Sequence, residues 1–134
     1  MKASVVIANY NNSKFINECI ESLNNQTYKD IEIIFFDDNS KDDSLEIIKK
    51  FENINIIENK IQTKFGSFNQ MNAFKESIRS SSGEIIFLLD SDDYFRDDKI
   101  EKVMNFFLKN KNENIVFDYP IVKKGNEEIS KKKK

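Results

Sequence analysis

The sequence contains no histidine and no tryptophan, and it has one cysteine, one proline and three glycines. Without histidine, a Ser-His-Asp triad, an imidazole general base and a His-ligated zinc site are excluded. The glycines at positions 66, 83 and 125 form neither a G-x-G-x-x-G motif nor a P-loop. Catalysis or metal binding must therefore depend on oxygen ligands, above all Asp and Glu, which suit Mg²⁺ or Mn²⁺.

Long hydrophobic runs are also missing. The longest apolar run, Ile85–Leu89, has five residues, whereas a membrane-spanning helix needs about 20. The N-terminus shows no signal-peptide layout, and the single Cys19, which we expect to pack on a helix face, cannot form an internal disulfide. These features predict a cytoplasmic protein.

Acidic residues outnumber basic ones, 23 to 21, and the charge is unevenly distributed. Without Lys131–Lys134 the chain carries 17 basic and 23 acidic residues, a formal charge of −6. A body of that sign argues against nucleic-acid binding, which needs a basic face. We expect the four terminal lysines to be solvated; the alternative is peripheral contact with an anionic inner membrane face.

The length of 134 residues fits one domain, and its pattern alternates between short apolar runs and helical periodicity. The runs predict strands at Val5–Ala8, Ile31–Phe36, Ile54–Ile57, Ile85–Leu89 and Ile115–Phe117. Continuous apolar runs are typical of a sheet covered on both faces, so the order predicts a parallel, doubly wound α/β fold. We expect Ile85–Leu89 to be a central strand beside Val5–Ala8.

Apolar residues three or four positions apart predict helices around Phe15–Leu23, Leu45–Phe51, Phe65–Ile78 and Ile100–Phe107. In the third helix, the face predicted to enter the core consists of Phe65, Phe68, Met71, Phe74 and Ile78. A capping-box spacing predicts Ser40 as the N-cap of the second helix. After Pro120 the chain becomes polar, which predicts a domain over 1–122 and a disordered basic tail over 123–134.

Two acidic clusters follow predicted strands. Asp37 and Asp38 come directly after Ile31–Phe36, and Asp90–Asp93 directly after Ile85–Leu89. In doubly wound sheets, ligands bind at the carboxyl ends of the strands, and carboxylates beside a dry core repel one another unless a cation neutralises them. A ligand or metal role is therefore favoured for Asp38 and Asp90–Asp93. For Asp42 and Asp43 we expect capping and solvation of a turn.

Several functions fit carboxylates at strand ends. A phospho-receiver domain would need an acidic pair after the first strand, but Ala8–Asn11 contains no acid, so this layout fails. A nucleoside-diphosphate site bridged by a metal ion fits better. A structural domain with an idle acidic rim is a third interpretation, and it predicts no metal-dependent stabilisation by a ligand.

Four segments in order resemble family 2 glycosyltransferases, which have the GT-A fold. They are Ser4–Asn11, Cys19–Tyr28, Asp37–Asp42 and Gly83–Asp93, the last of which carries a D-x-D motif. The resemblance extends from Ser4 to about Phe107. It implies a three-layer, Rossmann-like fold that binds a nucleotide-diphospho-sugar on a mostly parallel sheet.

The resemblance also implies a donor, a set of nucleotide-binding residues and a metal site. The nucleotide-binding residues implied are Ala8, Tyr10, Asp38, Asp90 and Ser91, and the ligands of Mg²⁺ or Mn²⁺ are Asp92 and Asp90. In this resemblance Asp38 accepts hydrogen bonds from the base, most often uracil. The donor is then a UDP-sugar, and the acceptor is a glycan or a lipid-linked molecule of bacterial cell-surface polysaccharide synthesis.

The sequence departs from the family pattern at several positions. Ala8 replaces a usual proline, Asn39 replaces a glycine, and Lys75 stands where an asparagine is common. Lys64 or Lys75 is a candidate for a phosphate contact, with surface solvation as the alternative. Between the D-x-D segment and the tail, the acids are Asp97, Asp98, Glu101, Glu113 and Asp118, and none resembles the acceptor-side catalytic base.

The chain thus resembles the donor-binding half of a transferase, with its catalytic base unidentified. The alternative is a non-catalytic fragment that binds a nucleotide-sugar. If an acceptor half is missing, the apolar surface that it would cover predicts self-association.

Overall fold

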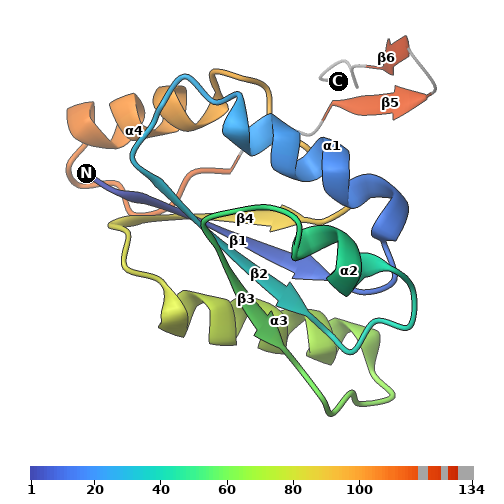
Figure 1. Ribbon diagram of the computed structural model, residues 1–134. Helices are drawn as coiled ribbons and strands as arrows, with labels where there is room; N and C mark the ends of the chain where they lie inside the picture. Colours follow the sequence, from blue (N-terminus) through green and yellow to red (C-terminus); the bar gives the residue numbers. More distant parts are fainter. Residues whose placement is uncertain (118–120, 125–126, 130–134) are drawn as a thin grey trace.

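The computed structural model describes residues 1–117, 121–124 and 127–129. Its main sheet has four parallel strands in the order β3-β2-β1-β4 (Figure 1). The strands are β1 (Ala3–Asn9), β2 (Ile31–Asp37), β3 (Ile54–Glu58) and β4 (Ile85–Asp90). The prediction of a parallel α/β fold is confirmed.

Helices cover both faces of this sheet, which makes three layers (Figure 1). The helices are α1 (Ser13–Asn24), α2 (Ser44–Ile48), α3 (Gly66–Ser80) and α4 (Lys99–Lys109). The first, second and fourth lie on one face, and α3 lies on the other, where it packs against β1 and β2.

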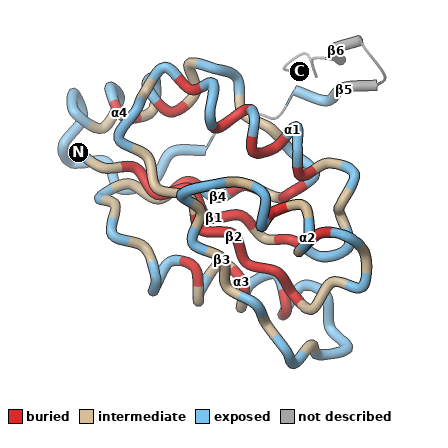
Figure 2. The backbone as a smooth tube through the Cα atoms, viewed as in Figure 1, coloured by how far each residue is buried: buried red, intermediate tan, exposed pale blue. Residues whose placement is uncertain are grey.

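The core lies mainly between the sheet and the three helices on its first face (Figure 2). Val5 and Ile7 of β1 point into it. Ile16 and Ile20 of α1 pack against them and are at most 1% exposed. Cys19 belongs to the same cluster and is 1% exposed, so its predicted packing role is confirmed.

The predicted position of Ile85–Leu89 is correct in one respect and wrong in another. The strand lies beside β1 as expected, but within the described residues β4 is an edge strand rather than a central one. Leu88 is 55% exposed, although Phe87 and Leu89 on the opposite face are buried. Leu88 is exposed because α3 packs mainly over β1 and β2 and covers little of the same face of β4.

The third helix forms where expected, but it presents a different face to the sheet. Its buried residues are Asn69, Ala73 and Ser77. Four residues of the predicted core face, Phe65, Phe68, Met71 and Ile78, are between 42% and 61% exposed. Small side chains allow the helix to approach the sheet closely, whereas the larger apolar ones point away. The prediction that Met71 packs in the core is therefore wrong.

Two local predictions also fail. Ile115–Phe117 is not a strand, and no described strand pairs with it; Phe117 is 89% exposed. A strand needs a hydrogen-bonding neighbour, and the apolar run alone does not supply one. Ser40 is not a helix N-cap, because α2 begins at Ser44 after Asp43. Ser40 instead donates from Oγ to Oδ1 of Asp37 at 2.6 Å.

The expected capping role of Asp42 is confirmed. Its carboxylate accepts a hydrogen bond from the backbone N–H of Ser13 at 2.9 Å and from that of Ser44 at 3.0 Å, which ties together the starts of α1 and α2. Burial by itself raises the pKa of Asp42, but the hydrogen bonds from Ser44 and Ser13 outweigh it and lower the pKa to about 2.

The last part of the chain contains a short antiparallel pair, β5 (Val122–Lys124) and β6 (Glu127–Ile129). Apart from Val122, this pair lies within 123–134, the range for which the sequence predicts a disordered tail. Residues 118–120, 125–126 and 130–134, including Lys131–Lys134 and Asp118, lie outside the described residues. No helix in the described part of the chain is long and apolar enough to cross a membrane.

Candidate functional site

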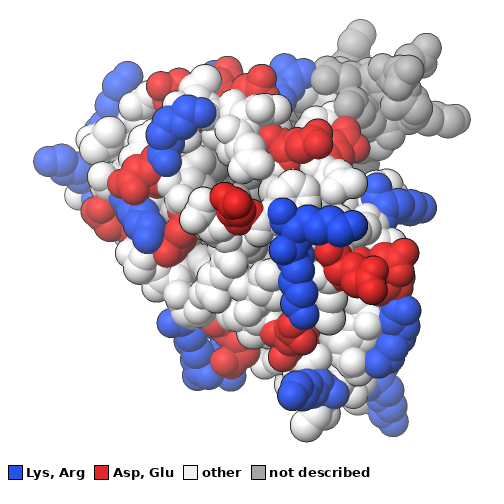
Figure 3. Space-filling view, in the orientation of Figure 1, with Lys and Arg blue, Asp and Glu red and all other residues white. Residues whose placement is uncertain are grey.

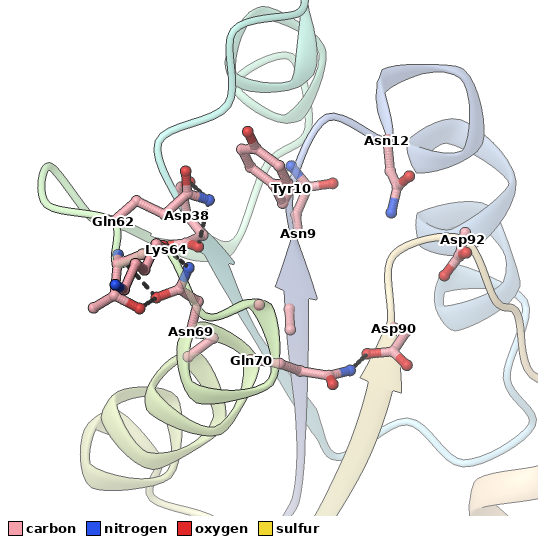
Figure 4. Close-up of a pocket in the computed structure, with 14 residues that line it drawn as sticks. Asn9, Tyr10, Asn12, Asp38, Gln62, Lys64, Asn69, Gln70, Asp90 and Asp92 are labelled. Atoms are coloured by element: carbon pink, nitrogen blue, oxygen red, sulfur yellow. Dashed lines mark hydrogen bonds between the residues drawn. The ribbon is translucent and has the colours of Figure 1, made fainter.

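A cavity of about 480 Å³ opens at the carboxyl ends of β1, β2 and β4 (Figure 4). The chain runs from β1 outward to β3 and then returns to place β4 on the other side of β1, so the cavity lies where the strand order reverses. This is the position at which doubly wound sheets bind their ligands. Its volume is in the range of small-molecule sites, roughly 300–1,000 Å³.

The structure brings most of the predicted site residues together around this cavity. The lining includes Ala8, Tyr10, Asp38, Asp90 and Asp92. Ser91 does not line it and is fully buried. Its Oγ accepts a hydrogen bond of 3.0 Å from Nδ2 of Asn12, and its N–H donates to the carbonyl of Ala8 at 3.1 Å. In this position Ser91 anchors the loop that carries the neighbouring aspartates.

Asp38 lies at one end of the cavity, immediately after β2. The residue is 5% exposed, and its N–H donates to the carbonyl of Asn9 at 2.9 Å. Its carboxylate accepts hydrogen bonds from Nδ2 of Asn59 at 2.6 Å and Nε2 of Gln62 at 2.9 Å. The next residue, Asn39, has φ of 58°, which explains why asparagine can replace the glycine usual in the family pattern.

Tyr10 lies beside Asp38 at the mouth of the cavity (Figure 4). It follows β1 directly and is 47% exposed. A large aromatic ring that is half accessible at a cavity mouth can pack against a flat ligand without a large change in structure. This end of the cavity therefore combines a ring with a hydrogen-bonded carboxylate.

The other end of the cavity is acidic. Asp90 ends β4 and accepts a 2.8 Å hydrogen bond from Nε2 of Gln70 on α3, while Asp92 lies on the following loop (Figure 4). Burial raises the pKa of the adjacent Asp93, and repulsion from Asp92 and Asp90 raises it further. The negative charge here is thus incompletely compensated by the described side chains.

The negative charge at the acidic end of the cavity also affects a residue of the core, Cys19. Burial raises the pKa of the Cys19 thiol to about 12, and the negative charges of Asp93, Asp92 and Asp90 add to the increase. Cys19 is therefore a protonated, inert packing residue, in contrast to a reactive thiolate.

The acidic end fits a cation that a ligand also coordinates. Among the described residues, no group of three or more His, Cys, Asp or Glu side chains forms a protein metal cage. Asp90 and Asp92 do border one cavity. Mg²⁺ is commonly bound by one or two carboxylates together with substrate phosphates and water. Two carboxylates are sufficient for that kind of site.

Sequence reasoning missed most of the cavity wall contributed by the segment 62–73. This wall includes Gln62, Thr63, Asn69, Gln70 and Ala73. Asn69 closes the loop before α3, because its Nδ2 donates to the carbonyl of Thr63 and its Oδ1 accepts from Oγ1 of Thr63 at 2.7 Å. Amides and small residues carry no spacing signal of their own. Lys64, which the sequence marks as a phosphate candidate, also lines the cavity.

The surface charges are mixed on the face shown in Figure 3. Lys and Arg side chains alternate there with Asp and Glu, and the described residues of this face form no continuous basic area. This distribution agrees with the small negative net charge.

The fold and the cavity together define a doubly wound α/β domain of the class that binds nucleotides and other phosphate-bearing ligands at the ends of its strands. Residues 4–134 match the family described as glycosyl transferase family 2. The chain belongs to this family, and its fold is the GT-A glycosyltransferase fold. The predicted family and fold class are confirmed.

Two similar proteins are named as glycosyltransferases. The chain is 39% identical to the poly(ribitol-phosphate) beta-glucosyltransferase of Bacillus spizizenii, over 84% of this chain and 18% of that protein. It is 37% identical to the UDP-Glc:alpha-D-GlcNAc-diphosphoundecaprenol beta-1,3-glucosyltransferase WfaP of Escherichia coli, over 87% of this chain and 44% of WfaP. The chain thus spans less than half the length of these relatives.

A solved structure shows the same fold with a nucleotide-sugar present. The crystal structure of S. aureus TarS 1-349 in complex with UDP-GlcNAc superposes with a TM-score of 0.71 and 27% sequence identity. The match covers 83% of this chain and 32% of the TarS chain.

Proposed function

We propose that this chain binds a UDP-sugar, together with Mg²⁺ or Mn²⁺, as the donor-binding part of a glycosyltransferase. The observation that carries the proposal is the division of one cavity into two chemically different ends. Tyr10 and Asp38 form an aromatic and hydrogen-bonding end, and Asp90 and Asp92 form an acidic end. A nucleoside diphosphate has the same division, with a flat base at one end and charged phosphates at the other.

At the first end, the Tyr10 ring packs on the base, and the carboxylate of Asp38 accepts a hydrogen bond from a base N–H. Uracil supplies such an N–H. The small side chain of Ala8 at the end of β1 leaves room beside the ring. The similarity to TarS, whose structure contains UDP-GlcNAc, supports this choice of donor.

At the second end, Asp92 and Asp90 hold the metal ion. When bound, the metal neutralises negative charge on the leaving nucleoside diphosphate. The protein carries a charge of −6 outside Lys131–Lys134, so its carboxylates and a diphosphate repel one another without a cation. Metal-dependent binding of UDP is the direct consequence.

The acceptor is proposed to be a glycan or a lipid-linked molecule of the cell surface. The relatives support this class, because one is named for a poly(ribitol-phosphate) acceptor and another for a diphosphoundecaprenol-linked one. A cytoplasmic location with peripheral contact at the inner membrane face would fit such acceptors. Contact through Lys131–Lys134 remains a prediction, because these lysines lie outside the described residues.

A second candidate function is donor binding without sugar transfer. The carboxylates that line the cavity are Asp38, Asp90 and Asp92, and each is assigned above to the base or to the metal. The acids between Asp93 and Phe117, namely Asp97, Asp98, Glu101 and Glu113, do not line it. A base for the acceptor hydroxyl is therefore still needed from elsewhere. We expect this chain alone to show at most slow hydrolysis of a UDP-sugar, without transfer.

Thermal unfolding with UDP tests the proposal. We expect UDP to raise the Tm in Mn²⁺ or Mg²⁺ and to have little effect in EDTA. Binding only to the native state adds about 2.7 kcal/mol of stability at a ligand concentration of a hundred times Kd. Asp92→Asn should remove most of this stabilisation. Asp43→Asn, which removes one charge outside the cavity, should not. Equal shifts with UDP in EDTA and in Mn²⁺ would contradict the metal assignment.

A further inference from the structure

The carboxylate of Asp38 is held between two side-chain amides. Nδ2 of Asn59 donates to Oδ1 at 2.6 Å, and Nε2 of Gln62 donates to Oδ2 at 2.9 Å. Asn59 follows β3 directly, and Gln62 lies on the loop before α3. Of these two amides, only that of Gln62 borders the cavity, where Figure 4 shows it beside Asp38.

The two amides differ in the hydrogen-bonding capacity that they retain. A primary amide nitrogen carries two hydrogens. Asn59 uses both, one for Asp38 and one for the carbonyl of Ile61 at 2.8 Å, and its Oδ1 accepts from the N–H of Ile61 at 3.3 Å. Asn59 is therefore a positioning residue that fixes the carboxylate against the loop.

Gln62 uses its nitrogen less firmly. One hydrogen bonds the Asp38 carboxylate at 2.9 Å, and the second makes a longer bond of 3.3 Å to the Asp38 carbonyl, which a ligand acceptor in the cavity can replace. Next to the cavity, the carboxylate is thus an acceptor and the Gln62 amide an adjacent donor.

We propose that Gln62 reads the base together with Asp38, and that the pair selects uracil over cytosine. This inference rests on the proposed function above. Uracil presents N3–H flanked by two carbonyl oxygens, so its N–H can donate to Asp38 while one carbonyl accepts from Gln62. Cytosine presents an unprotonated ring nitrogen with an amino group beside it. In the same position, its ring nitrogen would place an acceptor against the Asp38 carboxylate, and its amino group would place a donor against the Gln62 amide N–H. With Asp38 alone, the neighbouring carbonyl of uracil would receive no hydrogen bond from the pair.

The test compares UDP with CDP at saturating Mn²⁺, in the wild type and in Gln62→Met. Methionine has a similar length but lacks the donor. We expect the Kd for UDP to rise about 5- to 10-fold, as for the loss of one hydrogen bond to a buried partner, whereas the Kd for CDP changes less than about twofold. The preference for UDP over CDP should fall by the same factor.

Two further measurements make the test specific. The analogues 4-thio-UDP and 2-thio-UDP each replace one carbonyl oxygen by sulfur, a weaker acceptor. The analogue altered at the carbonyl that Gln62 reads should bind less tightly than UDP to the wild type but equally to Gln62→Met. Gln62→Glu, which puts an acceptor where the donor was, should weaken UDP binding further and shift the preference toward CDP.

The matched control is Gln70→Met, the same chemical change in the same cavity. The Gln70 amide donates to Asp90 at the acidic end, so this variant should change the Kd values for UDP and CDP by equal factors. If Gln62→Met also changes both equally, Gln62 only positions Asp38 and the inference is overturned. If the wild type binds no UDP in Mn²⁺, the proposed function itself fails. A wild-type preference for UDP that survives in Gln62→Met overturns the inference alone.

Discussion

Nδ2 of Asn9 donates a 2.8 Å hydrogen bond to Oδ1 of Asp37, and both residues are buried, at 2% and 1% exposed. Ser40 adds its N–H to Oδ2 at 3.0 Å and its hydroxyl to Oδ1. The carboxylate thus joins the ends of β1 and β2 and fixes the turn after β2. Asp37 and Asp38 are neighbours in sequence, but the first is enclosed by protein donors and the second borders the cavity.

Asp37→Ala is expected to destabilise the fold by about 1–3 kcal/mol, because it removes the carboxylate that accepts hydrogen bonds from the buried Asn9 amide and from the N–H and hydroxyl of Ser40. Chemical denaturation measures this loss. Asp38→Ala is the matched control, since it makes the same change one residue later, and its cost should be smaller because Asn59 and Gln62 lie in a loop. Equal losses from the two variants would contradict the division of roles.

Asp38→Ala should act on ligand binding. Its proposed partner is the base, so the variant should lower the affinity for UDP about tenfold, as expected for a hydrogen bond to a charged group. The dependence on Mn²⁺ should remain, because Asp90 and Asp92 are unchanged. Titration calorimetry with and without EDTA measures both quantities. A variant that binds UDP as well in EDTA as in Mn²⁺ would show that Asp38, too, serves the metal.

The sequence was sufficient to predict the strands that lie in the main sheet, because each is a short, near-continuous apolar run, including β4, one face of which is exposed at Leu88. It was not sufficient for Ile115–Phe117, since the same pattern becomes a strand only beside an available neighbour. Nor did periodicity identify the buried face of α3. Ala73 and Ser77 pack against the sheet because they are small, whereas the hydrophobic stripe that includes Met71 is exposed.

In the site, too, the sequence predicts some residues and not others. Asp38, Asp90 and Asp92 could be selected because each follows an apolar strand, and the fold then brings them to one cavity. Gln62 and Asn59 could not, because an amide in a loop has no characteristic spacing. Their significance depends on the closing of the loop onto Asp38, which is a tertiary contact.

At the end of the sheet opposite the cavity, the carboxylate of Glu32 holds several segments together. Its carboxylate accepts hydrogen bonds from Nζ of Lys2 at 2.8 Å, from Oγ of Ser4, and from the N–H of Gly83 at 2.9 Å. Burial by itself raises the pKa of Glu32, but hydrogen bonds from Lys2, Ser4 and Ser82 outweigh it and lower the pKa to about 2. This contact joins β1, β2 and the turn before β4.

Because the folded-state pKa lies below the ordinary value of 4.5, the charged Glu32 stabilises the fold above about pH 4.5. This contribution should be lost progressively as the pH falls from 4.5 toward 2. Glu32→Gln should lower stability by about 1–3 kcal/mol at pH 7 and by less near pH 2.5. Denaturation at a series of pH values measures the difference. Some acid sensitivity should remain, since the pKa of Asp42 is also about 2. A difference that does not change with pH would contradict the assignment.

An apolar surface on the α3 side of the molecule predicts self-association. Met71 and Ile78 of α3 are 59% and 42% exposed, and Leu88 of β4 is 55% exposed on the face of the sheet that α3 partly covers. Sedimentation equilibrium should show a mass that rises with protein concentration. The double variant Met71→Lys and Leu88→Lys should reduce this association, because it adds charge to the surface. Ile61→Lys, at an exposed loop residue, is the control. A wild type that stays monomeric at high concentration would contradict the prediction.

The edge position of β4 predicts an alternating pattern of hydrogen exchange. The N–H groups of Ile85 and Ser91 donate to carbonyls of Lys2 and Ala8, so the alternation along a parallel strand directs those of Phe87 and Leu89 toward β1 as well. The N–H of Leu88 then points to the open side of β4, where the described chain supplies no strand. Amide exchange followed by NMR should therefore be slow at Phe87 and Leu89 and fast at Leu88. Slow exchange at all three positions would mean that another segment, from this chain or a second copy, pairs with β4. Fast exchange at Phe87 would contradict its pairing with β1 and, with it, the strand order on which the position of the cavity depends.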